Sequence, residues 1–142
     1  MAIEQNKRLA IRIFEIFPEV ADSGAVDALD EVMTPDVKVH GTAGDFGSRA
    51  EFKEAVRSLA QQMGRTTIDV HNIVAEGDFV VALYTHSASF AMDFQGMAAA
   101  GKTVRFTGTM VYRIEDGKVA EAWIHEDIPR MLAQLGASPV GA

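Results

Sequence analysis

The stretch that decides the fold is Thr103–Asp127, which reads TVRFTGTMVYRIEDGKVAEAWIHED. Two segments rich in β-branched and aromatic residues flank the dipeptide Asp116–Gly117. An Asp-Gly pair between two such segments is the strongest short-range signal for a β-hairpin with a type I′ turn. We therefore predict two antiparallel strands, Thr103–Ile114 and Val119–Glu126.

The turn also predicts a register for this hairpin. If Asp116 and Gly117 alone form the loop, Ile114 lies opposite Val119, and side chains of opposite residues share a face. One face is then expected to carry Phe106, Gly108, Met110, Tyr112, Glu121, Trp123, His125 and Asp127. The other face is expected to carry Arg105, Thr107, Thr109, Val111, Arg113, Ala120, Ala122 and Ile124.

The first of these faces combines aromatic and sulfur-containing side chains with ionisable groups. An ionisable group among apolar walls is a common arrangement for acid–base chemistry, because the apolar surroundings shift its pKa. Gly108 leaves room opposite His125, and a glycine in mid-strand helps a sheet to bend around a pocket. We therefore predict an apolar, ligand-sized pocket on this face. Its predicted lining is Phe106, Met110, Trp123, His125 and Asp127.

Each of these residues also has a purely structural interpretation. Asp127 stands directly before Ile128–Pro129 and could serve as the N-cap of a short last helix, Ile128–Leu135. His125 could face solvent, and Trp123 could be an ordinary core residue, as could Met110 and Phe106. The capping and catalytic roles of Asp127 are compatible with each other.

Upstream of the hairpin the sequence predicts three helices and further strands. The first helix is Ile3–Phe17, which has an apolar face that includes Phe14 and which Pro18 ends or bends. The second is Ala25–Met33, and the third is capped by Ser48 and Glu51 and runs to Met63. The strands are Val37–His40, Thr66–Ala75 and Phe79–Ala91. This order is that of a single α+β domain, residues 1–142, and not of alternating βαβ units.

Composition narrows the choice of partner. The formal net charge of −7 disfavours nucleic acid and anionic membranes, and the longest apolar runs are too short to span a bilayer. The chain has no cysteine, and the polar start of the chain does not resemble a leader. We expect a cytoplasmic protein that binds a small apolar ligand.

Three further histidines are weaker candidates. His40 ends a predicted strand beside a glycine-rich loop, His86 shares a strand face with Tyr84, and His71 is expected on a solvated face. No two histidines have a spacing typical of metal ligands, so we predict no metal site.

Several short motifs occur in an order that points to a known family. They are Asn6–Lys7, Asp36–Val37 leading to His40, Glu76–Gly77–Asp78, the run D-G-K-V-x-E-x-W-x-x-x-D from Asp116 to Asp127, and Gln134–Leu135–Gly136. With these motifs the chain resembles the SnoaL-like polyketide cyclase and ester cyclase group of the nuclear-transport-factor-2-like superfamily. It departs from the usual T-H-x-G-x-F-x-G pattern, because Ala88 replaces the first glycine of that segment, and Ala100–Gly101–Lys102 lacks the usual threonine.

The resemblance implies a cone-shaped fold in which a curved antiparallel sheet wraps around the N-terminal helices. It also implies that Asp127 is the acid/base of an intramolecular aldol closure that needs no metal or cofactor. His125 or His40 would assist Asp127. The predicted substrate contacts are Trp123, Met110, Phe106, Tyr84, His86 and Phe14.

Two other functions remain open at this point. The protein could be a non-catalytic ligand-binding or interaction domain in which Asp127 only caps a helix. It could also be an epoxide hydrolase, which needs a carboxylate pair and an arginine, such as Arg12 or Arg113, around an activated water. We further predict a homodimer formed by the second sheet face, through Thr107, Thr109, Val111, Ala122 and Ile124.

Overall fold

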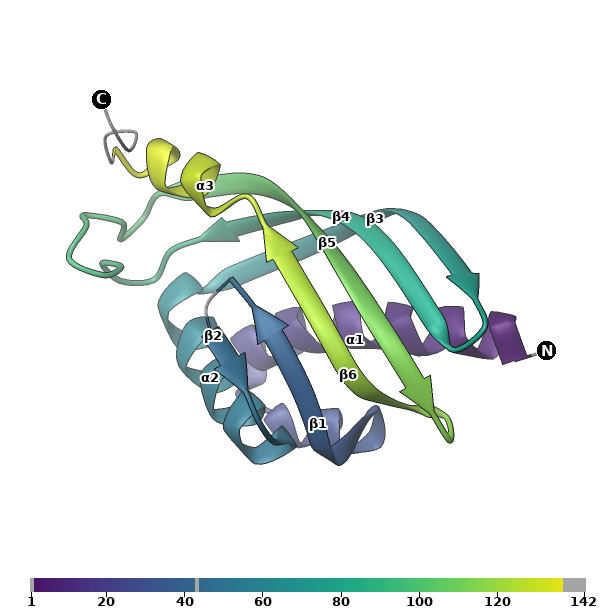
Figure 1. Cartoon of the computed structure of the whole chain (residues 1–142). Coiled ribbons are helices and arrows are strands. Elements are labelled where there is room, and N and C mark those ends of the chain that lie inside the picture. The colour runs from purple at the N-terminus through teal and green to yellow at the C-terminus, as the bar shows by residue number, and fades with distance from the viewer. Residues whose placement is uncertain (1, 43, 137–142) are drawn as a thin grey trace.

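The computed structural model describes residues 2–42 and 44–136 and consists of helices on one side of a bent sheet (Figure 1). The helices are α1 (Ala2–Ser23), the 3₁₀-helix η1 (Val26–Glu31), α2 (Arg49–Met63) and α3 (Ile128–Gln134). The strands are β1 (Met33–Gly41), β2 (Gly44–Phe46), β3 (Arg65–Glu76), β4 (Phe79–Ser89), β5 (Thr103–Glu115) and β6 (Lys118–Glu126).

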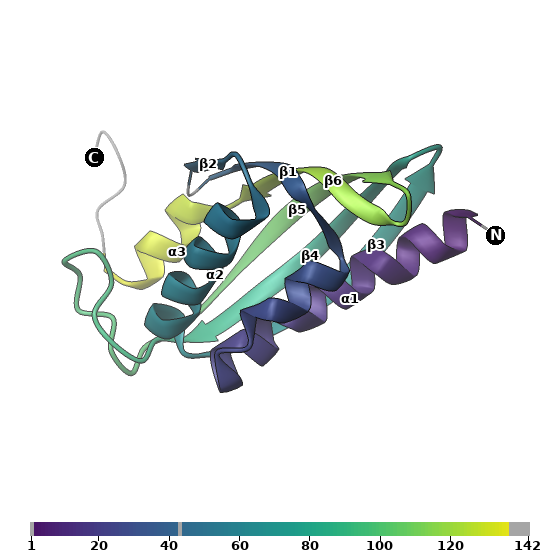
Figure 2. The same ribbon diagram turned by 90° about the horizontal axis from the view of Figure 1, so that it is seen from below.

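The six strands form one sheet in the order β2-β1-β6-β5-β4-β3. All neighbours are antiparallel except β1 and β6, which pair in parallel. The α+β architecture with helices against one sheet face is therefore confirmed, but the sheet is mixed and not purely antiparallel. Figure 2 shows α1 and α2 lying on the same side of the sheet, where they cover its inner face.

Most helices and strands lie where the sequence predicts them, with differences at some of their ends. The side chain of Ser48 accepts a hydrogen bond from the Glu51 backbone N–H at the start of α2, as predicted, and the Glu51 carboxylate accepts one from the Gly47 N–H. The helix α1 differs from prediction, since it continues through Pro18 to Ser23. Strand β1 begins four residues earlier than predicted and contains Thr34–Pro35, and the short second helix is a 3₁₀-helix.

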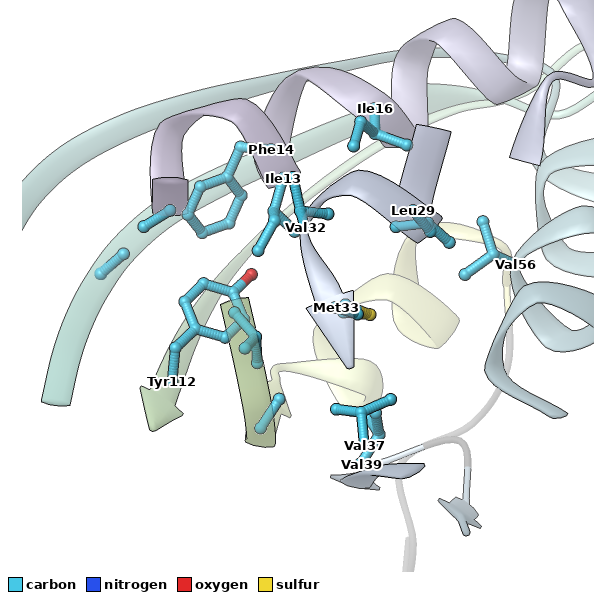
Figure 3. Close-up of a cluster of buried hydrophobic side chains, with 14 of the residues drawn as sticks. Ile13, Phe14, Ile16, Leu29, Val32, Met33, Val37, Val39, Val56 and Tyr112 are labelled. Atoms are coloured by element: carbon cyan, nitrogen blue, oxygen red, sulfur yellow. The ribbon is translucent and has the colours of Figure 1, made fainter. Parts of the chain in front are cut away.

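The main core lies between α1 and the inner face of the sheet. Figure 3 shows Phe14 of α1 facing Tyr112 of β5, and the two ring centroids are 6.3 Å apart. Valines from β1 and β4 complete this core, and Val37, Val39 and Val80 are fully buried. A second apolar cluster, around Phe90, Phe106 and Met131, joins α3 to the far end of the sheet.

The β5–β6 hairpin follows the predicted register only next to its turn. Asp116 and Gly117 have φ angles of 51° and 79°, as a type I′ turn requires, and Ile114 pairs with Val119. Ala120 is then an extra residue in a β-bulge, so that Arg113 pairs with Glu121. Beyond the bulge the predicted pairing is wrong by one residue, and Gly108 lies opposite Glu126, not His125.

A single-residue shift moves the part of β6 beyond the bulge to the opposite face. Val119 and Ala122 are both fully buried, although their spacing would place them on opposite faces of a regular strand. The bulge at Ala120 lets both reach the core. As a consequence Ala122, Ile124 and Glu126 face inward, and Trp123 and His125 face outward.

Candidate active site

A cavity of about 400 Å³ lies between the inner sheet face and the helices α1 and α2. Its walls are mostly aromatic and aliphatic side chains, which include Ile13, Phe14, Phe17, Phe46, Phe52, Leu59, Phe94, Met110 and Ile124. Its volume and apolar lining are typical of a small-molecule site. Among the residues that the structure describes, Glu126 is the only Asp, Glu, Lys or Arg in this lining.

The Glu126 carboxylate is held at the cavity wall by a tyrosine two strands away. Tyr84, Gly108 and Glu126 lie side by side on β4, β5 and β6, and the Tyr84 hydroxyl donates a hydrogen bond to Glu126 Oε2 at 2.8 Å. A Cβ atom at position 108 would lie 2.5 Å from Cζ and Oη of Tyr84. Glycine is therefore required here so that the tyrosine ring can cross β5 and reach the carboxylate.

Both tyrosines of this region stay protonated at neutral pH. Burial raises the pKa of Tyr84 far above its ordinary value, and the nearby Glu126 carboxylate raises it further. Burial likewise raises the pKa of Tyr112, whose hydroxyl donates to the sulfur of Met110 at 2.8 Å. At neutral pH Tyr84 therefore keeps the proton that it donates to Glu126.

His86 is the second ionisable group in the cavity wall. It is only 4% exposed, and its Nδ1 lies 3.7 Å from Glu126 Oε2. Its ring lies between Phe17 and Phe106, with centroid distances of 5.4 Å and 4.9 Å. Glu126, Tyr84 and His86 together form a cluster of ionisable groups in the wall of a mostly apolar cavity.

The residues predicted as the catalytic pair lie elsewhere. Asp127 is exposed and caps α3, where its side chain accepts a hydrogen bond from the Arg130 N–H at 3.2 Å. It lines a separate depression with Arg105 and Gln134. His125 is exposed on the outer face opposite Thr109. The prediction that both line the apolar pocket is therefore wrong, because the bulge reverses the strand faces.

His40 and Trp123 also lie on the outer face, so the prediction of Trp123 in the pocket is wrong as well. Their rings stack with centroids 5.6 Å apart, and His40 Nε2 lies 2.7 Å from Glu121 Oε2. The hydrogen bond with His40, followed by the contact with Arg113, lowers the pKa of Glu121 below its ordinary value. This cluster is half-exposed and has no access to the cavity.

Other predicted contacts do lie at the cavity. Phe14, Met110 and His86 line it, Tyr84 reaches it through Glu126, and Phe106 packs behind His86. Glu126 was missed by the sequence prediction. Alternation along β6 does not single it out, because apolar residues stand on both sides of the strand: Ala120, Ala122 and Ile124 alternate with Glu126, and Val119 and Trp123 occupy the other side.

No metal centre accompanies this site in the described part of the chain. Residues 2–42 and 44–136 contain no cluster of three His, Cys, Asp or Glu side chains that could hold an ion. Within the same residues no helix combines the length and the apolar character needed to cross a membrane.

The fold and cavity define a class of one-sheet α+β proteins that enclose an apolar space against their N-terminal helices. A family model for the SnoaL-like polyketide cyclases matches residues 11–135, and the chain therefore belongs to that family. No curated protein sequence matched it.

Solved structures agree with this assignment. IdmH from Streptomyces antibioticus, named as a proposed polyketide cyclase, is 27% identical, with a TM-score of 0.80 over 94% of this chain and 99% of its own. A SnoaL-like protein from Jannaschia sp. CCS1, also named as a proposed cyclase, is 22% identical with a TM-score of 0.84, over 96% and 95% of the two chains. A LEH-like epoxide hydrolase of M. tuberculosis is 17% identical, with a TM-score of 0.70 over 95% and 92%. The last two share the fold alone.

Proposed function

We propose that the protein is an acid–base enzyme of the polyketide cyclase type, with Glu126 as the group that moves the proton. The observation that carries this proposal is the position of Glu126, which is the only described carboxylate of a 400 Å³ apolar cavity and is held there by Tyr84. A carboxylate among apolar walls can abstract a proton from a carbon next to a carbonyl group.

The proposed reaction is an intramolecular aldol closure of an apolar carbonyl compound. Glu126 removes a proton from the carbon beside one carbonyl, and the resulting enolate carbon attacks a second carbonyl of the same molecule. The new alkoxide then takes the proton back from Glu126. The proton is returned and no electron acceptor is needed, so the step balances with the substrate and this one residue.

Epoxide hydrolysis is less well supported. That reaction would require a second carboxylate and an arginine near the water that Glu126 activates, and the described lining has neither. The two arginines considered for this role are engaged elsewhere. Arg12 pairs with Glu19 on the exposed side of α1, and Arg113 lies 3.4 Å from Glu121.

Exchange of carbon-bound hydrogen tests the proposal without knowledge of the natural substrate. We expect the wild-type protein to accelerate hydrogen–deuterium exchange next to the carbonyl of 2-tetralone in D₂O, followed by NMR. Glu126→Gln keeps the size of the side chain and an acceptor for Tyr84 but cannot take a proton. It should lower the exchange rate by about 10²–10⁴-fold, the usual contribution of a positioned acid or base.

Glu121→Gln is the matched control, because Glu121 is a carboxylate on the same strand that faces outward. It should exchange 2-tetralone like the wild type. Full exchange activity in Glu126→Gln would end the catalytic proposal. Binding of aromatic ketones without exchange in the wild type would favour the non-catalytic binding domain instead.

A further inference from the structure

The side chain of Tyr84 is enclosed along its whole length. The residue is fully buried, and the centroid of its ring lies 5.0 Å from that of Phe14 on α1. The far end of the ring lies over Gly108, where even a Cβ atom would come within 2.5 Å of Cζ and Oη. A ring enclosed in this way keeps its hydroxyl in one place, and that place is 2.8 Å from Glu126 Oε2.

The two oxygens of the Glu126 carboxylate have different surroundings. Oε2 accepts the hydrogen bond from Tyr84, and it is also the oxygen that lies 3.7 Å from His86 Nδ1. Oε1 makes no hydrogen bond with a described residue. The enclosed side-chain oxygen and nitrogen atoms without a partner in that part of the chain are Thr34 Oγ1 and His86 Nε2. Glu126 Oε1 is not one of them, so it is an accessible oxygen of a residue that lines the cavity.

We infer that Tyr84 is a positioning residue that anchors Oε2 of Glu126, so that Oε1 is the oxygen that exchanges the proton with the substrate. The inference rests on the proposed function, in which Glu126 is the base. In the proposed reaction the bond from carbon to hydrogen breaks and a bond from Oε1 to hydrogen forms. The same proton later leaves Oε1 for the new alkoxide, and Tyr84 keeps its own proton throughout.

Two physical effects favour this division of roles. A carboxylate among apolar walls loses its hydration, and a hydrogen bond to Oε2 compensates part of that loss while leaving Oε1 unoccupied. A glutamate side chain also has several rotatable bonds, so a fixed donor on one oxygen confines the other to one direction. Such confinement acts on the rate of proton transfer and not on the affinity for the substrate.

Tyr84→Phe measures the contribution of the hydroxyl, because it removes one oxygen atom and keeps the ring between Phe14 and Gly108. The rate of 2-tetralone exchange at saturation is followed by NMR, and the dissociation constant of 2-tetralone by titration calorimetry. We expect the saturated rate to fall by about 10–10²-fold, as the loss of a hydrogen bond to a charged group predicts. The dissociation constant should stay at the wild-type value, whereas a cavity that had merely loosened would also bind more weakly.

Thr85→Val is the matched control. Thr85 is the next residue on β4, it is also buried, and its hydroxyl lies 2.6 Å from Nε2 of His71. The variant therefore loses a buried hydroxyl from the same strand, and it should keep both the exchange rate and the dissociation constant. A full exchange rate in Tyr84→Phe, with exchange lost in Glu126→Gln, would overturn this inference and leave the proposed function standing.

NMR of the Tyr84 hydroxyl proton gives a second test that needs no turnover. A buried hydroxyl proton in a hydrogen bond exchanges slowly with water and is observed directly in tyrosine-labelled protein. We expect its signal to move upfield in Glu126→Gln, because a neutral acceptor forms a weaker bond than a carboxylate, and to stay in place in Glu121→Gln. An unchanged signal in Glu126→Gln would contradict the inference. The expected shift in a protein that does not exchange 2-tetralone would support the anchored oxygen and remove only the proposed function.

Discussion

At the scale of single residues, the site depends on a contact that crosses three strands. Tyr84 reaches Glu126 because position 108 between them has no side chain. The same tyrosine is fully buried, and Tyr112 beside it is 1% exposed. Burial therefore keeps both phenols protonated, and a protonated Tyr84 can donate its hydrogen bond to the Glu126 carboxylate.

These two tyrosines, which are the only ones in the chain, give a prediction for alkaline pH. Their pKa values are raised in the folded protein, whereas in the unfolded chain they are ordinary, about 10. Below about pH 10 this difference has its full stabilising effect, and above it the unfolded chain releases protons that the folded one keeps. Stability should therefore fall as the pH rises above about 10.

The measurement follows tyrosinate absorbance and circular dichroism over the same alkaline titration. We expect both signals to change together in one cooperative transition, because the phenols ionise only when the protein unfolds. Tyrosinate formation while the circular dichroism remains native would show that at least one phenol is accessible in the folded state.

At the scale of elements, the bulge in β6 and the cap of α3 together decide which carboxylate enters the cavity. Glu126 is the last residue of β6 and follows the inner face. Asp127 is the next residue and turns away to cap α3. Neighbouring carboxylates thus receive different environments, one in the cavity wall and one at a helix terminus.

Substitutions of Asp127 separate capping from catalysis. Asparagine caps helices about as well as aspartate, whereas alanine at an N-cap costs typically about 1 kcal/mol. We expect Asp127→Asn to match the wild type in both melting temperature and 2-tetralone exchange. Asp127→Ala should be less stable by about 1 kcal/mol in urea unfolding and otherwise active. A folded Asp127→Asn that has lost exchange would return the catalytic role to Asp127, as the family resemblance implies.

At the scale of the whole molecule, the outer sheet face carries an apolar row. Val74, Val81, Val111 and Trp123 lie side by side across β3, β4, β5 and β6. Val74 is 62% exposed, and Phe79 and Leu83 beside the row are 44% and 42% exposed. Of the residues first predicted for a dimer surface, Ala122 and Ile124 belong to the inner face, so this row replaces them.

We propose that this row is the contact surface of a homodimer, since an exposed apolar patch of this kind is typical of a self-association surface. Light scattering at micromolar concentration should give about twice the 15.4 kDa of one chain. Leu83→Glu places a charge beside the row and should yield the monomer mass, while Gln61→Glu, on the exposed side of α2, should not. A wild-type monomer would contradict the proposal.

The sequence by itself determined the features that depend on local stereochemistry. The Asp116–Gly117 turn requires positive φ angles, the Ser48 cap satisfies a backbone N–H within its own helix, and alternation along β4 placed Tyr84 and His86 on one face. These signals lie within a few residues of one another, so the chain carries them wherever it folds.

Only the tertiary structure decided which residues of β6 face the cavity. Side chains of a strand alternate between its two faces, and one extra residue inverts this alternation. Nothing in the local sequence marks Ala120 as that extra residue. The bulge follows from packing, because Val119 and Ala122 must both be buried and Ala122 must pair with Val39 of β1. That parallel pairing joins segments more than 80 residues apart. The carboxylate in the cavity is therefore Glu126, a consequence of long-range contacts.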